Sequence, residues 1–270
     1  MVGSLETEVL IFGESESAWS DELTAMHEAE AASSHPIDLA SRRLAVESMR
    51  NLTGCPGKIV LDIGCSSGFL IQDLMKFLPD VSVFGADYLI NVVLEAARRN
   101  PGTPFVQFDL RKCPLENQCV DGVTALNVLE HIDDDLSALK QIHRILKPGG
   151  IVHIEVPAGP SLYDMYDEVL MHFRRYRLGD LTALAIHAGF TIERATHLGF
   201  LLYPGFALVK QKYQRVAKNF TIQEKRRSVA QHIRKTAGSR ALSAILGIEL
   251  VAGRLTTYPF GIRAVVRLRR

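Results

Sequence analysis

Residues 60–70 join a strand-like apolar run to an apolar-periodic helix through a turn of small residues. The segment is Val-Leu-Asp-Ile-Gly-Cys-Ser-Ser-Gly-Phe-Leu, so an acid, Asp62, lies two residues before the turn. Small residues allow the backbone to approach a ligand closely, and the helix N-terminus offers unpaired N–H groups and a partial positive charge. No Lys-Ser/Thr pair closes the turn, which excludes a triphosphate-binding P-loop.

Strand-like and helical patterns alternate regularly around this turn. Strand-like runs lie at 58–63, 81–86, 104–108, 120–127 and 150–156, with helical patterns between them at 68–78, 89–99 and 134–146. Strand–helix–strand at this spacing predicts an α/β protein with a parallel, doubly wound sheet and crossover helices. In such a sheet the ligand binds beyond the carboxyl ends of the strands.

The 270-residue chain is long enough for one large α/β domain with an insertion, or for two small domains. We predict four segments: an N-terminal arm or lid at 1–34, a ligand-binding core at 35–198, a helical insertion or lid at 199–257, and the final strand of the core sheet at 258–270.

The formal net charge of +1 gives no global basic field that would favour nucleic acid. The charge is uneven, however. Residues 1–41 hold nine acids and no Lys or Arg, whereas residues 210–240 hold ten Lys or Arg and one acid. The basic 210–240 segment therefore keeps a nucleic-acid partner open as an alternative.

The four cysteines show no metal-binding spacing with one another or with histidine, so we expect no metal site and a reduced, cytoplasmic compartment. The acidic N-terminus does not resemble a signal peptide. The longest apolar run, 198–209, is too short to span a bilayer.

Two acids follow neighbouring strands of the predicted sheet. Asp87 ends the second strand, and an acid ~20 residues past a glycine-rich turn is placed to accept both hydroxyls of a ribose. Tyr88 beside it is a candidate to pack on an adenine. Asp109 ends the third strand, where it is a candidate to accept the adenine amino group, with the N–H of Leu110 facing the ring.

The turn, Asp87, Asp109, the Asn127–Ile132 segment and the Lys-Pro-Gly-Gly break at 147–150 follow in an order and spacing that resemble the class I S-adenosylmethionine (SAM)-dependent methyltransferases. The first motif of that family is hydrophobic-acid-x-Gly-x-Gly-x-Gly, and here Ser66 replaces the middle glycine. The resemblance covers about residues 58–156. It implies a Rossmann-like, doubly wound, seven-stranded sheet whose last strand, 261–268, is antiparallel, with a helical lid insertion.

The same resemblance implies roles for individual residues. The SAM pocket would be shaped by Asp62, Gly64, Cys65, Ser66 and Gly68. Asp87 would bind the ribose, Asp109 the adenine, and Asn127 would lie against the methionine part. A nicotinamide cofactor is disfavoured, because the turn lacks the GxGxxG spacing.

Methyl transfer is an in-line displacement at an already activated sulfonium, so much of the catalysis can be proximity and alignment. An acid–base residue is required only where the acceptor must lose a proton. The segment after the fourth strand is Asn-Val-Leu-Glu. It is neither the Asn/Asp-Pro-Pro-Tyr of enzymes that methylate exocyclic base nitrogens nor a Pro-Cys nucleophile for pyrimidine carbon. Both differences disfavour nucleic acid as the acceptor.

Residues 157–177 are polar and aromatic, and they resemble a subfamily of small-molecule methyltransferases often found near glycosyl-transfer and natural-product genes. A helix over 162–173 would place Asp164, Glu168 and His172 on one face. His172 is a candidate general base, and His131 is its rival. The alternative is a satisfied polar network of His172, Arg175 and Asp167 that holds the lid.

The candidate acceptor-binding residues are Arg174 and Arg175, for an anionic group, together with Tyr163 and Tyr176. We therefore predict a SAM-dependent methyltransferase that acts, most simply at oxygen, on a small natural-product, sugar-linked or lipid-linked acceptor. A membrane-surface substrate and a homodimer are further expectations, and no specific nucleic acid is expected. The alternatives are an RNA methyltransferase that uses the 210–240 surface and a SAM-binding partner protein without transferase activity.

Overall fold

The computed structural model describes residues 8–12, 35–217 and 220–270. Within them, eight strands form one sheet in the order β1-β4-β3-β2-β5-β6-β8-β7. The strands are β1 (Val9–Ile11), β2 (Lys58–Ile63), β3 (Val81–Asp87), β4 (Phe105–Gln107), β5 (Val120–Leu126), β6 (Leu146–Pro157), β7 (Thr191–Leu198) and β8 (Arg263–Arg269).

Strands β1 to β6 pair in parallel, whereas β8 pairs antiparallel with both β6 and β7. The predicted doubly wound α/β sheet with an antiparallel last strand is confirmed. Strand β1 lies at the edge beside β4 and adds an eighth strand to the seven that were predicted. The remainder of the predicted arm at 1–34 lies outside the described residues.

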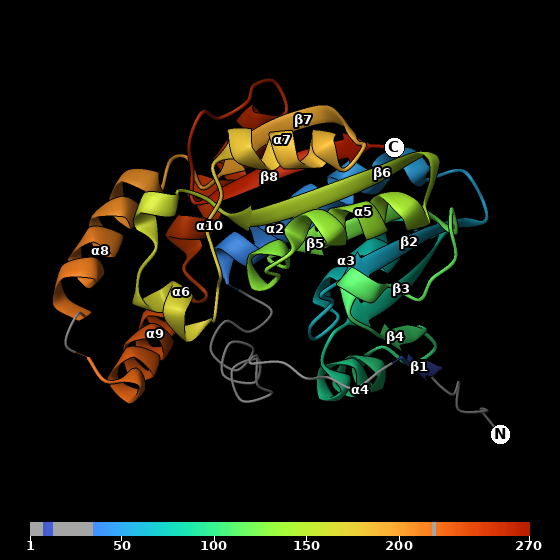
Figure 1. The fold of residues 1–270 in the computed structure, drawn as a ribbon. Helices are drawn as coiled ribbons and strands as arrows, with labels where there is room; N and C mark the ends of the chain where they lie inside the picture. Colours follow the sequence, from blue (N-terminus) through green and yellow to red (C-terminus); the bar gives the residue numbers. More distant parts are fainter. Residues whose placement is uncertain (1–7, 13–34, 218–219) are drawn as a thin grey trace.

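Helices cover both faces of the sheet (Figure 1). They are α2 (Pro36–Met49), α3 (Phe69–Phe77), α4 (Ile90–Arg99), α5 (Asp135–Ile145), α6 (Met165–Val169), α7 (Leu178–His187), α8 (Tyr203–Val216), α9 (Ile222–Thr236) and α10 (Arg240–Gly253). One apolar core joins α5 and α7 to the sheet through buried residues such as Leu139 and Leu181. A second core joins α2, α3 and α4 to the sheet through Met49, Ile71 and Val93.

The 199–257 segment folds as α8, α9 and α10, between β7 and β8 in the chain. Helices α8 and α9 lie with α6 at one end of the sheet, as Figure 1 shows. A small apolar cluster of Val169, Val229 and Ile233 joins α9 to α6. None of the helices in the described ranges is long and apolar enough to cross a membrane.

The helix considered over 162–173 is shorter in the structure, where α6 spans only Met165–Val169. Asp164 and Asp167 form a capping box that starts the helix at Met165. Met171 then adopts a left-handed conformation with a φ of 54°, which a right-handed helix cannot contain. Asp164 and His172 therefore lie outside the helix, and their proximity has another origin.

Candidate cofactor and acceptor site

The turn after β2 has the tight backbone that its small residues predicted. Gly64, Ser66 and Gly68 all have positive φ, of 70°, 46° and 77°. A Cβ on Gly64 would lie 2.5 Å from Val128 Cγ2, so only glycine fits there. The N–H groups of Gly64 and of the buried Cys65 both donate to Ala86 O, at 2.8 and 3.0 Å. These bonds fix the turn against the end of β3.

Asp87 lies at the end of β3, beside this turn. Its carboxylate accepts from the backbone N–H of Ser66 at 3.2 Å and from that of Leu89 at 3.1 Å. Both Asp87 and Tyr88 line a cavity, and Gln107 donates to the carbonyl of Tyr88. Two backbone donors thus orient an acceptor-only group toward a ligand, as a ribose diol requires.

The other predicted cofactor residues line the same cavity: Asp62, Asp109, Leu110 and Asn127. Burial raises the pKa of Asp62 to about 7, and Thr124 Oγ1 donates to it at 2.7 Å. Burial opposes ionisation of Asp109, but its hydrogen bonds from Arg111 outweigh burial and hold its pKa below the usual range. Gly68 is the exception, since it does not line the cavity and begins α3.

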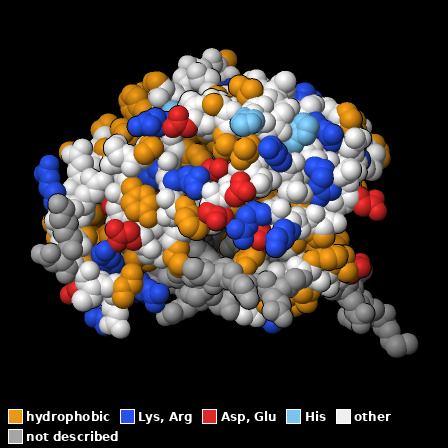
Figure 2. Space-filling view, in the orientation of Figure 1, with side chains coloured by type: hydrophobic (Ala, Val, Ile, Leu, Met, Phe, Trp, Pro, Cys, Tyr) orange, Lys and Arg blue, Asp and Glu red, His pale blue; other side chains and the backbone are white. Residues whose placement is uncertain are grey.

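The cavity has a volume of about 980 Å³ and continues from the cofactor edge to the lid helices. Its far wall carries apolar residues of α8 and α10, among them Phe206, Val209 and Leu246. Figure 2 shows acidic and basic side chains gathered around a hollow in the middle of one face. A volume at the upper end of the range for ligand pockets has room for a cofactor and a small second ligand.

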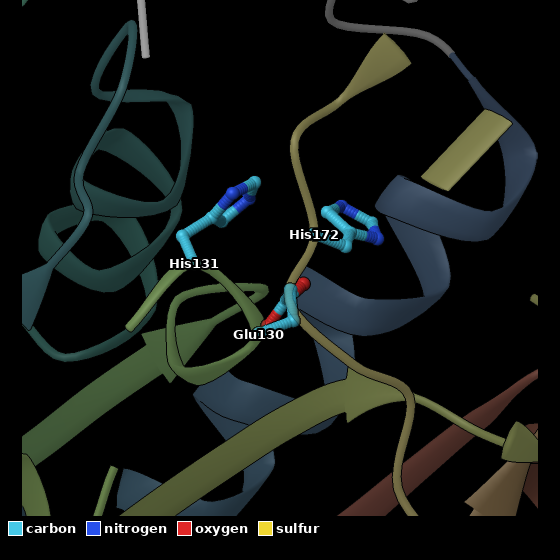
Figure 3. A group of neighbouring side chains, drawn as sticks. All are labelled: Glu130, His131 and His172. Atoms are coloured by element: carbon cyan, nitrogen blue, oxygen red, sulfur yellow. The ribbon is translucent and has the colours of Figure 1, made fainter. Parts of the chain in front are cut away.

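Glu130, His131 and His172 form a cluster on the wall of this cavity (Figure 3). Glu130 and His131 belong to the short helical turn Leu129–His131 that follows β5, and His172 follows α6. The backbone N–H of Phe173 donates to Glu130 O at 2.8 Å, which holds the two segments together. The two imidazole rings meet edge to face, with ring centres 4.7 Å apart.

Each acid of this region has a different environment. Glu130 has no exposed surface, and burial raises its pKa to about 8. Neither of its carboxylate oxygens has a hydrogen-bond partner among the described residues. Asp167 is also fully buried, but His172 Nδ1 and Arg175 Nε lie 2.9 and 2.8 Å from its Oδ1. These partners outweigh burial and hold the pKa of Asp167 below its usual range.

A lysine from the lid completes this buried network. Lys210, from α8, has 4% of its surface exposed, and its Nζ lies 2.6 Å from Asp164 Oδ1 and 3.5 Å from Asp167 Oδ2. These ion pairs attach the lid to residues 164–167, in addition to the apolar packing between α9 and α6. The anticipated polar network of His172, Arg175 and Asp167 is therefore present, and it includes Lys210 as well.

Of the four predicted acceptor-binding residues, one lines the cavity and three do not. Arg175 lines the cavity, but Asp167 engages its guanidinium. Arg174, Tyr163 and Tyr176 do not line the cavity. Arg174 pairs with Asp135 at 3.0 Å, Tyr163 donates to His172 O, and Tyr176 donates to Asp135. All three hold the 160–176 segment in place instead of facing the ligand space.

Sequence reasoning missed Glu130, Asp164 as a partner of the lid, and Lys210. Glu130 stands in the Asn127–Ile132 segment that was singled out, so its place directly after a buried strand was an available signal. Lys210 was counted only as one of the charges of the basic 210–240 segment. No local signal distinguishes a buried lysine in such a run, because its partner Asp164 is 46 positions away.

The cavity lies at the carboxyl edge of a doubly wound sheet, which is where sheets of this kind bind their ligands. Residues 61–154 match the family model described as a methyltransferase domain. These residues therefore match a methyltransferase domain, and several curated relatives of the chain are named S-adenosylmethionine-dependent methyltransferases.

Relatives and solved structures agree with this assignment. A protein of Mycolicibacterium smegmatis named a probable S-adenosylmethionine-dependent methyltransferase is 31% identical over 56% of this chain and 59% of its own length. The ubiquinone biosynthesis O-methyltransferase of Pseudomonas paraeruginosa is 32% identical over 44% of this chain and 53% of its own. The chain thus spans about half the length of the curated relatives that it matches.

A solved structure, described as a sarcosine dimethylglycine methyltransferase (putative in its title) from Galdieria sulphuraria, has the same fold. Its TM-score is 0.61 at 15% identity, over 92% of this chain and 98% of that one.

The residues at the turn fit SAM. Gly64, Ser66 and Asp87 all line the cavity, and the N–H of Ser66 donates to the Asp87 carboxylate. Asp87 would hold the ribose, and Asp109, Leu110 and Asn127, which line the same cavity, would be available to the rest of the cofactor.

Proposed function

We propose that this protein is a SAM-dependent methyltransferase that methylates a hydroxyl oxygen of a small-molecule acceptor. The observation that carries the proposal is the continuity of the cavity of about 980 Å³. One space connects the cofactor edge at Asp87 with the Glu130–His131–His172 cluster and with the apolar lid. An acceptor held between the cluster and the lid would face the cofactor directly.

SAM, when bound, supplies a methyl group on a positively charged sulfur. The residues of this chain must then align the acceptor and accept the proton that its hydroxyl group loses. Alignment of two bound reactants by itself can supply a large part of the rate enhancement of such a reaction. The apolar side chains of α8 and α10 would exclude water from the acceptor.

The proton of a hydroxyl acceptor requires a nearby group that can take it. Asp167 is ionised and can only accept, so His172 carries its proton on Nδ1 and keeps a lone pair on Nε2. Within the described residues, Nε2 makes no hydrogen bond. His172 is therefore the first candidate in the cluster, and His131 is the second.

Oxygen as the methylated atom is supported by two relatives, which are named O-methyltransferase and ubiquinone biosynthesis O-methyltransferase. A natural-product, sugar-linked or lipid-linked acceptor would suit the apolar lid. The exposed side chains Leu208 on α8 and Ile248 and Val251 on α10 support a lipid-linked form or a homodimer. Flotation with anionic vesicles and sedimentation of the free protein distinguish these two.

An RNA acceptor has less support. In the basic 210–240 segment, Lys210 is buried against Asp164, and Lys225 is paired with Glu168. Fewer charges thus remain for phosphate than the sequence suggested. An RNA complex would weaken log-linearly with salt concentration, and we expect no such complex at physiological salt.

The test is a transfer assay with methyl-labelled SAM against hydroxylated small molecules, lipid-linked sugars and total RNA. We expect label in a small-molecule fraction and an O-methyl product by mass spectrometry. Label in RNA would support the RNA alternative. SAM binding by calorimetry, with no label transferred to any fraction, would support a SAM-binding partner protein.

A further inference from the structure

We propose that Glu130, His131 and His172 form a binding site for one divalent transition-metal ion on the acceptor side of the cavity. The inference rests on the proposed function, since the ion would hold the oxygen that receives the methyl group. It revises the expectation from the sequence, which contained no metal-binding spacing.

Geometry is the first support. One ligand atom from each of the three side chains lies within 4.8 Å of the other two. In Figure 3 the Glu130 carboxylate lies below and between the two imidazole rings. An ion bonded at about 2.0–2.2 Å would bring neighbouring ligand atoms to about 3–3.5 Å apart. The three side chains would have to rotate toward one another to close that gap.

The unpartnered carboxylate of Glu130 is the second support. This side chain has 0% of its surface exposed, lines the cavity, and has no hydrogen-bond partner for either oxygen among the described residues. No ion pair within those residues includes it. A buried carboxyl group without a partner is costly, and such groups are normally paired or coordinate a metal.

The Asp167–His172 contact is the third support. Asp167 Oδ1 lies 2.9 Å from His172 Nδ1, which leaves Nε2 as the ligand atom. Metal-binding histidines nearly always donate their other N–H group to a carboxylate or carbonyl, which fixes the ring and raises its basicity. Arg175 and Lys210 in turn fix Asp167.

The donor set indicates the class of ion. Two imidazoles and one carboxylate suit Zn²⁺, Mn²⁺, Fe²⁺, Co²⁺ or Ni²⁺ better than Mg²⁺ or Ca²⁺, which prefer oxygen ligands. Three protein ligands leave positions open toward the cavity. A hydroxyl oxygen of the acceptor, or two adjacent oxygens, would fill those positions. The ion would lower the pKa of the hydroxyl, whose proton would leave to solvent, and His172, with Nε2 on the ion, would then hold the ion instead of taking the proton itself.

The experiment measures binding of Co²⁺ and Mn²⁺ to the chelator-treated full chain, by visible absorption and by calorimetry, without SAM or acceptor. We expect one ion per chain. Glu130→Gln keeps the shape of the side chain, and His172→Ala removes one ligand. Each should weaken binding at least 10-fold. The matched control is His187→Ala, at an exposed histidine of α7, and it should bind like the wild type.

Absence of an ion from the wild type overturns the inference, and so does unchanged affinity in a folded Glu130→Gln variant. The wild-type result decides the matter even where a variant fails to fold. The labelled-SAM assay in chelator separates the two proposals. Methyl transfer without any bound ion would support the proposed function and refute the metal site. Ion binding without transfer to any acceptor would support the metal site and contradict the proposed function.

Discussion

His172 Nδ1 lies 2.9 Å from Asp167 Oδ1, and the same carboxylate receives the guanidinium of Arg175. Burial lowers the pKa of His172, although Asp167 opposes the shift. The imidazole is therefore neutral near pH 7, with its proton on Nδ1. Asp167 thus links His172 to Lys210 of the lid, and His172 also lines the cavity.

Asp87→Asn should weaken SAM binding about 10- to 100-fold. The charged oxygens that would accept the ribose hydroxyls become an amide, and hydrogen bonds to a charged group are worth about 1.5–3 kcal/mol. Calorimetry measures the affinity. Asp80→Asn, at the exposed position just before the same strand, is the control and should leave affinity unchanged. Equal affinity in both variants would refute the assignment of Asp87.

His172→Ala should lower turnover by about 10²–10⁴ while SAM affinity changes little, because the side chain lies on the acceptor side of the cavity. Transfer of labelled methyl groups and calorimetry measure the two quantities separately. Unchanged turnover in a folded variant would leave only the structural role of His172. In that case His131 becomes the candidate to test.

Lys210→Met should lower the free energy of unfolding by about 3–5 kcal/mol, because it leaves Asp164 buried without its cation. Denaturant titration measures the loss. Lys212→Met, at an exposed position of the same helix, should change stability by less than about 0.5 kcal/mol. Adding Asp164→Asn to Lys210→Met should restore part of the loss. No recovery in the double variant would argue against the ion pair as the cause.

Stability should fall in mild acid because of His153 in β6. Burial lowers the pKa of His153 to about 3, while Ser48 Oγ lies 2.8 Å from its Nδ1. The unfolded chain takes up this proton below pH ~6.5 and the folded chain does not, so stability present above that pH is lost as pH falls toward 3.

For His153 alone the loss between pH 7 and pH 5 is about 2 kcal/mol. Urea titrations at the two pH values measure it, and His153→Gln should reduce the difference by that amount. Replacement of the exposed His187 by Gln controls for loss of a histidine. A His153→Gln variant with the full wild-type difference would show that other groups cause the acid sensitivity.

Local pattern in the sequence was enough to predict the α/β sheet, the turn at Gly64–Gly68 and the place of Asp87. Each of these depends on residues that are near one another in the chain. A strand, a turn of small residues and a helix N-terminus are set by periodicity and backbone conformation within about ten residues. Strand order then brings the acids that follow the strands to one edge.

The tertiary structure alone decided the acceptor side of the site. The helix considered over 162–173 is confined to Met165–Val169. A capping box starts it at Met165 and the left-handed Met171 prevents its continuation, and neither is evident from apolar spacing. The hydrogen bond from Phe173 to Glu130 O then brings His172 beside Glu130 and His131. Lys210 meets Asp164 only after β7 and the lid have folded over the core. These contacts join residues that are far apart in the chain. The local sequence around one residue of such a pair therefore does not indicate which residue it contacts.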